Sequence, residues 1–343
     1  MKQISVVGLD LAKNVFQVHG VDASGEVVLT RQVKRKDLLV FFAGVKPCLI
    51  GMEACGGSHY WYRQLSQLGH EVRMMAPAFV KPYVKANKND RHDAEAICEA
   101  VQRPSMRFVS PKRPEQQAVL HLHRGRSLLV EQRVALTNHI RGILAEYGFV
   151  IPQGNKALNL HLAELLEDAD NELPMLTRHL LAELKAEHDQ LQSRIDHLEW
   201  QLKQWHAQDE RSQRLETIPG IGLQTATALA GAIDQGQDFK NGRQLAAYLG
   251  LVPRQASSGG KDRLLGISKR GDGYLRKLLI HGARSVIRHV RRRMQWGQPG
   301  GNPWVEQLLQ RCHPNEVAVA LANKMARIAW VLLARKETYR ANG

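Results

Sequence analysis

The sequence predicts an α/β domain built on a mixed sheet, followed by a coiled coil and a mainly helical C-terminal domain. Three observations support this fold class. Strand and helix patterns alternate up to about residue 105, apolar residues then recur at heptad spacing between Leu181 and Trp205, and a Pro-Gly-Ile-Gly turn at 219–222 separates two helical stretches. The chain has 343 residues, which is enough for two or three domains.

In the first part of the chain, short apolar and β-branched runs predict strands, and longer amphipathic runs predict helices. One helix opens at Gly56-Gly57-Ser58 and ends near Leu68, and another covers 90–102. Strands interrupted by single helices are typical of a mixed sheet with helices on its faces. The predicted strands cover 3–9, 14–21, 26–33, 47–53 and 71–75.

Four carboxylates occupy informative positions in this α/β pattern. Asp10 ends the first apolar run, and Glu53 ends a later one. Asp90 and Asp93 lie three residues apart at the start of a predicted helix, so they share one face of it. A strand Asp, a strand Glu and a helical Asp-x-x-Asp, in that order, are what a ribonuclease-H-like nuclease core needs.

Four anionic groups at one point repel one another, and a bound cation removes that repulsion. Oxygen-only ligands favour Mg²⁺ or Mn²⁺. Two such ions about 4 Å apart can activate a nucleophile and stabilise a leaving oxygen at a phosphate. A structural alternative remains open, because Asp90 could be the N-cap of its helix with Asp93 as a first-turn carboxylate. An Asp after a strand is also a common turn residue.

The segment from Pro114 to Tyr147 favours one long helix and is rich in arginine and histidine. It either presents a solvated amphipathic face or lies as a basic helix along phosphate backbones. In the second case, Arg124, Arg126 and Arg133 are the expected phosphate contacts.

The clearest periodicity in the chain follows this helix. Its residues alternate steps of three and four, as in a coiled coil. The coiled coil either pairs with a helix near 157–168 of the same chain or forms a contact between copies. The heptad residues are Leu181, Leu184, His188, Leu191, Ile195, Leu198, Leu202 and Trp205.

The C-terminal part opens with the Pro-Gly-Ile-Gly turn between two helical segments, which predicts a helix-hairpin-helix. Gly220 and Gly222 would let backbone N–H groups approach a phosphate, and the helix that follows adds its positive N-terminal end. The alternative is an ordinary turn between two helices. Neither structure is expected to recognise a particular base sequence. Another helix is expected at 243–250.

A segment rich in serine, glycine and basic residues occupies 254–273. It is either a solvated linker or a flexible loop that places a serine hydroxyl among cations. A serine needs a base, a metal ion or a stabilised leaving group before it attacks, and the spacing supports no Ser-His-Asp arrangement. Helices follow at 273–293 and 315–334. The basic residues expected to contact nucleic acid are Lys261, Arg263, Lys269, Arg270, Arg276, Arg288, Arg291 and Arg292.

The net charge of +15 indicates a polyanionic partner, with nucleic acid ahead of a membrane surface. Aromatic residues make up only 6%, so base stacking is not expected to be a broad mode of binding. No apolar stretch long enough to span a bilayer and no signal peptide are expected. The four cysteines form no Cys-x-x-Cys pair, which favours the reducing cytoplasm over a disulfide or zinc framework.

Together these motifs resemble a bacterial insertion-sequence transposase of the DEDD type, the family of bridge-RNA-guided serine recombinases. The Piv-type DNA invertases are relatives. The resemblance covers nearly the whole chain, and the Tyr-Gly…Ile-Pro-Gln-Gly segment at 147–154 suggests the subgroup. The other matching segments are Gly-Leu-Asp-Leu-Ala-Lys at 8–13, Met-Glu-Ala-Cys-Gly-Gly at 52–57, Lys-Asn-Asp-Arg-His-Asp-Ala at 88–94, Arg-Gly-Ile-Leu-Ala-Glu-Tyr-Gly at 141–148, Ile-Pro-Gly-Ile-Gly at 218–222 and Gly-Ile-Ser-Lys-Arg-Gly-Asp at 266–272.

The resemblance implies a RuvC-like first domain in which Asp10, Glu53, Asp90 and Asp93 bind Mg²⁺ or Mn²⁺. It also implies a cytoplasmic protein, associated with the bacterial nucleoid, that acts as a dimer or tetramer joined through its coiled coil. The expected domains are the RuvC-like domain at 1–110, a basic connecting helix at 111–154, the coiled coil at 155–210 and the C-terminal transposase domain at 211–343.

The resemblance further implies that the Ser-Gly segment supplies a nucleophilic serine. That serine falls on Ser258, and a slip of one residue would put it on Ser257. In such enzymes the two domains form a composite site across subunits, and the serine makes a covalent phosphoserine link to DNA. A structured non-coding RNA from the element would guide the reaction by pairing with donor and target DNA.

Three functions fit these patterns. The first is RNA-guided strand cleavage and rejoining by metal-assisted serine attack. The second is a protein-only site-specific DNA invertase or a RuvC-like junction nuclease. The third is a non-catalytic protein that bridges DNA duplexes. The four carboxylates argue against the third function, and a nucleophilic Ser258 separates the first from a plain nuclease, which transfers a phosphate to water.

Overall fold

The computed structural model of the chain describes residues 3–85 and 89–340. Lys88, the first residue of the matching segment at 88–94, lies outside the described residues. The chain divides into two compact units, Met1–Arg113 and Pro114–Gly343, each with its own hydrophobic core. The four-domain division stays a prediction.

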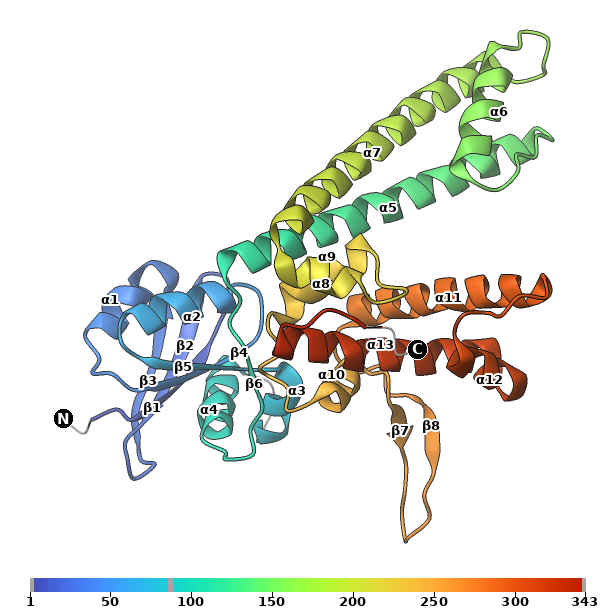
Figure 1. Cartoon of the computed structure of the whole chain (residues 1–343). Coiled ribbons are helices and arrows are strands. Elements are labelled where there is room, and N and C mark those ends of the chain that lie inside the picture. The colour runs from blue at the N-terminus through green and yellow to red at the C-terminus, as the bar shows by residue number, and fades with distance from the viewer. Residues whose placement is uncertain (1–2, 86–88, 341–343) are drawn as a thin grey trace. The chain divides into compact units, whose positions relative to one another are not determined.

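The first unit contains a six-stranded mixed sheet with the strand order β3-β2-β1-β4-β5-β6 (Figure 1). The strands β1, β2 and β3 are antiparallel neighbours, β4 and β5 continue parallel to β1, and β6 is antiparallel to β5. All five predicted strands are confirmed, and β6 is an additional short one. The strands are β1 Val6–Asp10, β2 Val15–Val21, β3 Val27–Lys34, β4 Leu49–Glu53, β5 Glu71–Met75 and β6 Phe108–Val109.

Helices cover both faces of this sheet. Buried side chains of α1 and α2 share one core with the strand residues Leu9 and Met52, whereas α4 packs against β1, β2 and β4 from the other face. The two predicted helices are confirmed as α2 and α4. The helices of this unit are α1 Leu38–Ala43, α2 Ser58–Gln67, α3 Pro77–Val80 and α4 Asp90–Val101, with 3-10 turns at Arg35–Asp37 and Lys81–Tyr83.

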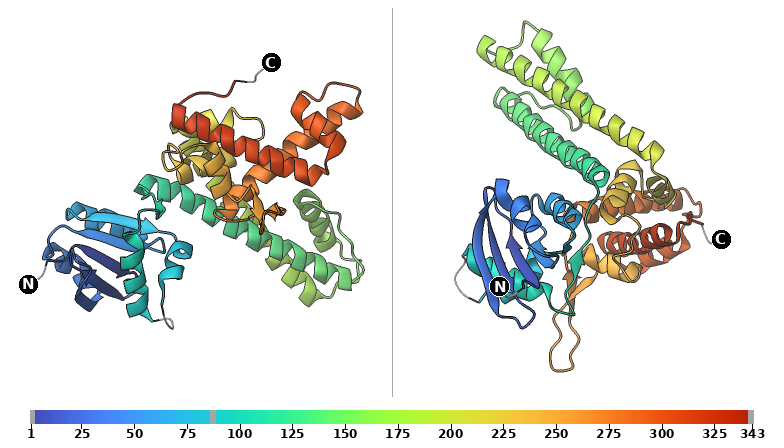
Figure 2. Two further views of the ribbon diagram at one scale, coloured as in Figure 1. Left: turned by 90° about the horizontal axis from the view of Figure 1, so that it is seen from below. Right: turned by 90° about the vertical axis from the view of Figure 1, so that its left-hand side faces the viewer.

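The second unit is mainly helical in its described residues. Its two longest helices, α5 and α7, lie side by side, with α6 near the end where they connect (Figures 1 and 2). The elements of this unit are α5 Pro114–Glu146, α6 Asn155–Glu167, α7 Met175–Gln208, α8 Glu210–Glu216, α9 Leu223–Ile233, α10 Gly242–Tyr248, β7 Pro253–Gln255, β8 Leu264–Ile267, α11 Gly273–Gln295, α12 Pro303–Arg311 and α13 Pro314–Arg335.

The heptad residues of α7 pack within this chain. Leu191 and Ile195 contact Leu129 of α5, and Leu181 shares a core with Leu158 of α6. An intramolecular pairing is therefore present, but its main partner is α5 and the helix near 157–168 covers only one end. Leu181, Leu191 and Ile195 are buried by their own chain, and a contact between copies through the coiled coil stays a prediction.

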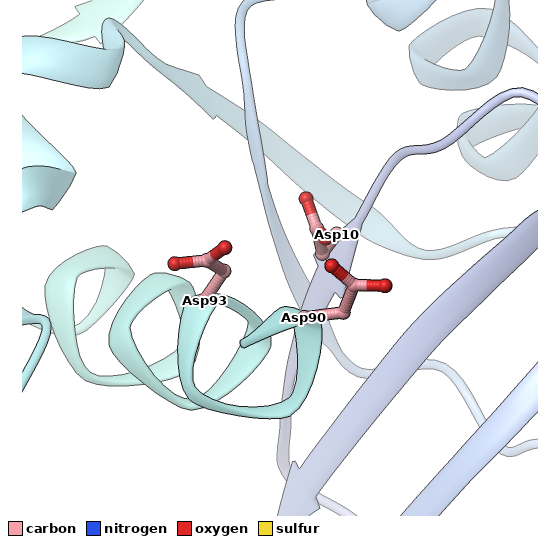
Figure 3. Close-up of side chains that lie close together, drawn as sticks. All are labelled: Asp10, Asp90 and Asp93. Carbon is pink, nitrogen blue, oxygen red and sulfur yellow. The ribbon is translucent and has the colours of Figure 1, made fainter. Parts of the chain in front are cut away.

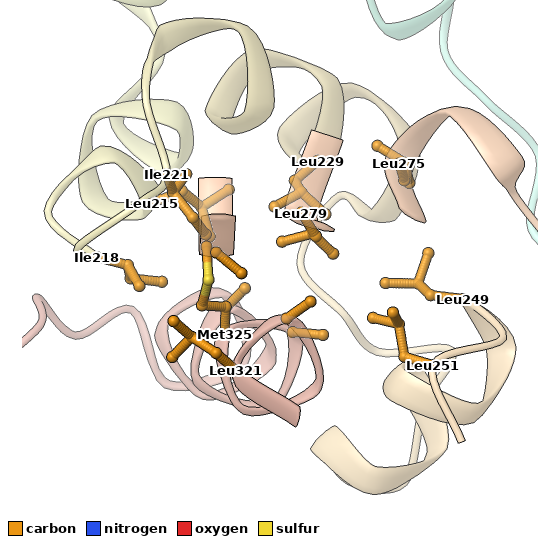
Figure 4. Close-up of a cluster of buried hydrophobic side chains, with 14 of the residues drawn as sticks. Leu215, Ile218, Ile221, Leu229, Leu249, Leu251, Leu275, Leu279, Leu321 and Met325 are labelled. Atoms are coloured by element: carbon orange, nitrogen blue, oxygen red, sulfur yellow. The ribbon is translucent and has the colours of Figure 1, made fainter. Parts of the chain in front are cut away.

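The largest core lies among helices α8 to α13 (Figure 4). Leu229 of α9, Leu279 of α11 and Leu321 of α13 meet in it. By length and composition, α13 could cross a membrane, whereas no apolar stretch long enough to do so was expected from the sequence. Its buried residues, Leu321 and Met325 among them, belong to this core, so α13 is a core helix of the second unit.

A buried polar network ties α5 to the C-terminal core. His123 of α5 lies 3.0 Å from the Tyr274 hydroxyl and 3.0 Å from the Thr227 hydroxyl. The Thr227 hydroxyl donates to the Leu223 carbonyl at 2.7 Å, so its oxygen accepts from Nε2–H of His123. A neutral ring then accepts at Nδ1 from Tyr274. Burial lowers the pKa of His123 to about 4, and the nearby Arg126 adds to the shift.

We expect His123 to make the second unit sensitive to acid. Its folded pKa of about 4 lies below the ordinary histidine value of 6.5, so the unfolded chain binds the proton first and stability is lost as pH falls from about 6.5 to about 4. Between pH 7.5 and pH 5 this loss is ~2 kcal/mol. Urea unfolding of the wild type and of His123→Gln at both pH values measures it.

In the His123→Gln variant, the difference in unfolding free energy between pH 7.5 and pH 5 is expected to be smaller by ~2 kcal/mol. This holds even if the variant is less stable than the wild type at both pH values. His121→Gln is the matched control, because His121 lies two residues away on the same helix and is exposed. An unchanged pH dependence in His123→Gln would show that this histidine is not held neutral by folding.

Candidate functional site

Strand alternation points Asp10 and Glu53 toward the same face of the sheet. The residues before them, Leu9 and Met52, belong to the core under α1 and α2. Because successive side chains of a strand point to opposite faces, the two carboxylates point to the face that α4 covers. The parallel register pairs Leu9 with Met52, so Asp10 and Glu53 follow at adjacent strand ends whose backbones lie about 4.8 Å apart.

Glycines placed two residues before each strand carboxylate bring α4 close to the sheet. A Cβ atom on Gly8 would lie 2.0 Å from the Ala94 carbonyl oxygen and 2.5 Å from the Cys98 nitrogen, and one on Gly51 would lie 2.7 Å from the Val101 Cβ. Only residues without a side chain permit this approach. This role of the two glycines was not predicted from the sequence, although the repeated spacing Gly-x-Asp and Gly-x-Glu is a signal for it.

The start of α4 decides between the two interpretations of its acidic residues. The N-cap is Asn89, whose side chain accepts a hydrogen bond from the Arg91 N–H at 2.9 Å. The alternative in which Asp90 caps the helix is therefore wrong. Asp90 is the first residue inside α4, and its carboxylate is not the group that caps the helix.

Three of the four predicted metal ligands converge (Figure 3). One carboxylate oxygen each from Asp10, Asp90 and Asp93 lies within 4.8 Å of the others. Glu53 is not part of this group, although its strand position places it beside Asp10. Burial raises the pKa of the Cys55 thiol, and the charges of Glu53 and Asp10 add to this increase, which indicates that both carboxylates lie near that thiol.

The donor set at this sheet edge fits a hard divalent cation. All the candidate ligands offer oxygen, the donor that Mg²⁺ and Mn²⁺ prefer. Mg²⁺–oxygen distances are about 2.1 Å, so two ligands of one ion lie up to ~4 Å apart. The observed spacing of up to 4.8 Å closes to that value with small side-chain rotations. Asp90 is exposed and the other two aspartates are half-buried, so the centre is open to a substrate.

We expect Gly8→Ala to disrupt this centre without touching a carboxylate. The new methyl group would meet the α4 backbone at 2.0 Å, so α4 must move away from β1 and carry Asp90 and Asp93 with it. Overpacking of this kind costs ~3 kcal/mol. Urea unfolding and Mn²⁺ titration of the folded protein measure both effects. Gly56→Ala is the control, because its methyl group meets nothing within 4 Å.

The serine-rich segment forms a hairpin and not the flexible loop expected from sequence. Strands β7 and β8 pair antiparallel. At the tip, the Lys261 N–H donates to the Ser258 carbonyl at 3.0 Å, and Gly259 and Gly260 have φ values of 55° and 77°. Positive φ at both central residues is the mark of a two-residue type I′ turn. Ser258 is therefore the last residue before the turn.

The two neighbouring serines differ in what their hydroxyls do. Ser257 Oγ accepts hydrogen bonds from the Gln255 side chain at 2.9 Å and from the Arg263 N–H at 3.2 Å. Within residues 3–85 and 89–340, no hydrogen bond involves the Ser258 hydroxyl, and Ser258 is exposed. Ser257 thus holds the hairpin together, whereas Ser258 presents its hydroxyl to solvent.

Some residues expected to contact nucleic acid form contacts within the chain. Arg126 pairs with Glu199 of α7 at 2.6 Å, and Arg133 donates to Gln192 of the same helix. Arg276 donates to two backbone carbonyls at the base of the serine hairpin, at 3.0 and 2.8 Å. Their contacts to nucleic acid stay predictions. The predicted residues that are exposed are Arg124, Gly222, Lys261, Arg263, Lys269, Arg270, Arg288, Arg291 and Arg292.

Gly220 of the Pro-Gly-Ile-Gly turn lies against α11. Its φ is 90°, and a Cβ atom added to Gly220 would lie 2.8 Å from Val286 Cγ2 and 2.9 Å from the Gly282 carbonyl oxygen, both in α11. Gly220 is therefore required for helix packing, whatever it contributes to phosphate binding. Gly222 is exposed and is the N-cap of α9.

Both units of the chain contain residues that match models of known protein families. Residues 7–149 match the family model DEDD_Tnp_IS110, described as "Transposase", and residues 212–297 match the model described as "Transposase IS116/IS110/IS902 family". The first range includes all four carboxylates, and the second includes the serine hairpin and α11.

Individual proteins resemble the chain over nearly its full length. A "Probable family 20 transposase" from Pseudomonas aeruginosa is 52% identical over 98% of this chain and 99% of its own length. The "Transposase for insertion sequence element IS1328" from Yersinia enterocolitica is 45% identical over 97% of each chain. The "Pilin gene-inverting protein" of Moraxella bovis is more distant, with 24% identity over 79% of this chain and 74% of its own.

Proposed function

The chain belongs to the IS116/IS110/IS902 family of insertion-sequence transposases, and from this membership we propose that it cleaves and rejoins DNA by attack of the Ser258 hydroxyl on a phosphodiester. The observation that carries the proposal is the convergence of Asp10, Asp90 and Asp93 at one sheet edge. A covalent protein–DNA adduct on the peptide that contains Ser258 is its test.

We assign the first unit to the RuvC-like, ribonuclease-H-like domains. Three features support this assignment: the antiparallel strands β1 to β3, the parallel strands β4 and β5 that follow, and an acidic helix lying across the strands that end in carboxylates. Asp10, Glu53, Asp90 and Asp93 would hold Mg²⁺ or Mn²⁺ there. Such ions supply positive charge that stabilises the extra negative charge of a phosphate under attack.

The serine step exchanges one phosphoester bond for another. The bond from Ser258 Oγ to phosphorus forms, and the bond from phosphorus to one sugar oxygen breaks. Solvent takes the serine proton and returns a proton to the sugar oxygen that leaves. A second sugar hydroxyl reverses the step on the phosphoserine link and joins new strands. Because the number of phosphoester bonds is constant, the reaction needs no nucleoside triphosphate.

The choice of Ser258 over Ser257 rests on their hydrogen bonds. A nucleophile must be free to approach phosphorus, and the Ser257 hydroxyl is engaged by Gln255 and Arg263. Exposed cations on the same hairpin, Lys261 and Arg263, would attract the phosphate. This arrangement supports a phosphodiester at the hairpin tip.

We further propose that a structured non-coding RNA guides the reaction and that the protein works in the cytoplasm on the bacterial nucleoid. The charge of +15 supports a partnership with both donor DNA and RNA. The alternative is a protein-only invertase, a function suggested by the name of the pilin gene-inverting relatives, or a RuvC-like junction nuclease.

We expect RNA of defined sequence to co-purify with the protein when it is expressed together with its element. Treatment with ribonuclease should abolish recombination, and adding the transcribed RNA back should restore it. Sequencing of the bound RNA and a plasmid recombination assay measure these outcomes. Full activity after complete RNA removal would favour the protein-only invertase and would leave the serine chemistry untouched.

A further inference from the structure

A basic groove runs along α11 in the second unit, with the start of α13 as its other wall. It encloses about 460 Å³ and is lined by Arg284, Arg288, Arg291 and Arg292 of α11 and by Pro314 and Asn315 of α13. The Arg284 guanidinium donates to the Asn315 side chain at 3.2 Å, so the two walls are held together by a polar contact. We call this feature the α11 groove.

The positive charge of the α11 groove is not neutralised by the chain itself. Its arginines recur at steps of four, three and one, so they share one helix face over about 12 Å. Helix α11 carries no Asp or Glu. In the described part of the chain, no carboxylate forms an ion pair with Arg288, Arg291 or Arg292. Uncompensated arginines on an ordered face indicate a phosphate-rich partner.

An exposed tryptophan adjoins the C-terminal end of the groove. Trp296 directly follows α11 and is 67% exposed. The Arg292 guanidinium, which lines the groove, lies 5.5 Å from the centre of the Trp296 ring. One part of the indole is thus fixed by a groove residue while most of the ring meets solvent. An aromatic ring beside a cationic track is how proteins stack unpaired bases.

We propose that the α11 groove binds an unpaired DNA strand, with its arginines on the phosphates and Trp296 stacked on one base. Bases inside a duplex are stacked on one another and offer no free face, so Trp296 would select unpaired strand over duplex. The strand is DNA because DNA is the substrate of this family. The inference rests on the proposed function only in that respect and is independent of Ser258 and the carboxylates.

A second exposed tryptophan provides a matched control. Trp200 of α7 is 56% exposed, and it stacks on His197 with ring centroids 5.9 Å apart. No groove arginine is its neighbour in sequence or among its ring contacts. Its removal tests whether the loss of any exposed indole weakens binding.

The experiment is fluorescence anisotropy of a labelled DNA strand of mixed sequence, its duplex and the equivalent RNA strand, in EDTA so that no strand transfer occurs. We expect Trp296→Ala to weaken binding to single-stranded DNA by about tenfold, which is the usual contribution of one stacked base. Duplex affinity should change less than twofold. Trp296→Phe should retain most of the single-strand affinity, and Trp200→Ala should bind as the wild type does.

Replacing Arg288 and Arg291 together with alanine should weaken both single-strand and duplex binding. It should also make the slope of log affinity against log salt shallower by about 1.4 for the single strand, because each lost phosphate contact removes about 0.7. Circular dichroism melting confirms that each variant is folded, as expected for exposed side chains.

Three results would overturn the inference: an unchanged single-strand affinity in Trp296→Ala, an equal loss for duplex, or a Trp296-dependent preference for the RNA strand, which would assign the groove to RNA. Binding in EDTA needs neither metal nor serine. A failure of the Ser258 adduct would therefore leave this result standing, and the reverse also holds.

Discussion

Asp10→Ala is expected to abolish strand transfer, by ~10³-fold or more, while nucleic-acid binding stays largely intact. The Asp10 carboxylate lies within 4.8 Å of Asp90 and Asp93, and its removal takes the only strand ligand out of that group. Metal ligands act on charge that develops in the transition state, whereas basic side chains supply most of the affinity for nucleic acid. A plasmid recombination assay and anisotropy with labelled DNA separate the two effects.

The same result is expected for Glu53→Ala, Asp90→Ala and Asp93→Ala. Asp37→Ala is the matched control, because Asp37 is an exposed carboxylate of the same unit outside the cluster. Mn²⁺ titration provides a readout that does not depend on activity, and each ligand variant should bind the ion more weakly than the control does. Near-normal recombination by Asp10→Ala in Mg²⁺ would contradict the metal-centre interpretation.

Glu53 gives this series its sharpest comparison. It is outside the group of three, yet its strand position places it at the strand end next to that of Asp10. If Glu53 is a ligand, Glu53→Ala and Asp10→Ala should lower Mn²⁺ affinity alike. If Glu53→Ala binds Mn²⁺ normally but fails in recombination, the Glu53 carboxylate acts on the substrate and not on the metal ion.

The carboxylate positions could be predicted from sequence because period-two alternation and a three-residue helical spacing are local signals. Asp10 and Glu53 end clear apolar runs, and each stands at a strand end as expected. The six-residue helix α1 and the two-residue strand β6 were not predicted because neither is long enough to show a period.

Long-range contacts account for the other differences. The heptad of α7 revealed one half of a helix pair, but nothing local identified α5 as the partner that buries Leu191. Charge alone likewise could not distinguish Arg276, whose guanidinium binds backbone carbonyls, from the exposed Arg288. The serine hairpin has almost no apolar alternation, so its pairing could not be recognised as strand structure.

Ser258→Ala is expected to fold and bind nucleic acid normally but to form no covalent adduct with DNA. The hydroxyl is exposed and makes no hydrogen bond within the described residues, so its removal should change stability by less than ~0.5 kcal/mol. It removes the only atom proposed to attack phosphorus. A suicide DNA substrate that traps the adduct, followed by mass spectrometry of the modified peptide, measures the effect.

Ser257→Ala is the matched control for this experiment, one residue away on the same hairpin. Because Ser257 accepts hydrogen bonds from Gln255 and Arg263, its replacement should loosen the hairpin and slow adduct formation without abolishing it. The reverse result, a normal Ser258→Ala and an inactive Ser257→Ala, would place the nucleophile one residue earlier and would mean that the hairpin rearranges to release the Ser257 hydroxyl.

The remaining outcomes separate the serine from the metal centre. If Ser258→Ala still nicks DNA but never joins strands, the carboxylates form a nuclease in their own right and the serine is needed only for the covalent link. If neither serine variant affects recombination, attack by water at the metal centre becomes the better account and the hairpin serves only to bind DNA. An adduct that maps to Ser258, together with its loss in Asp10→Ala, would show that one reaction needs both residues.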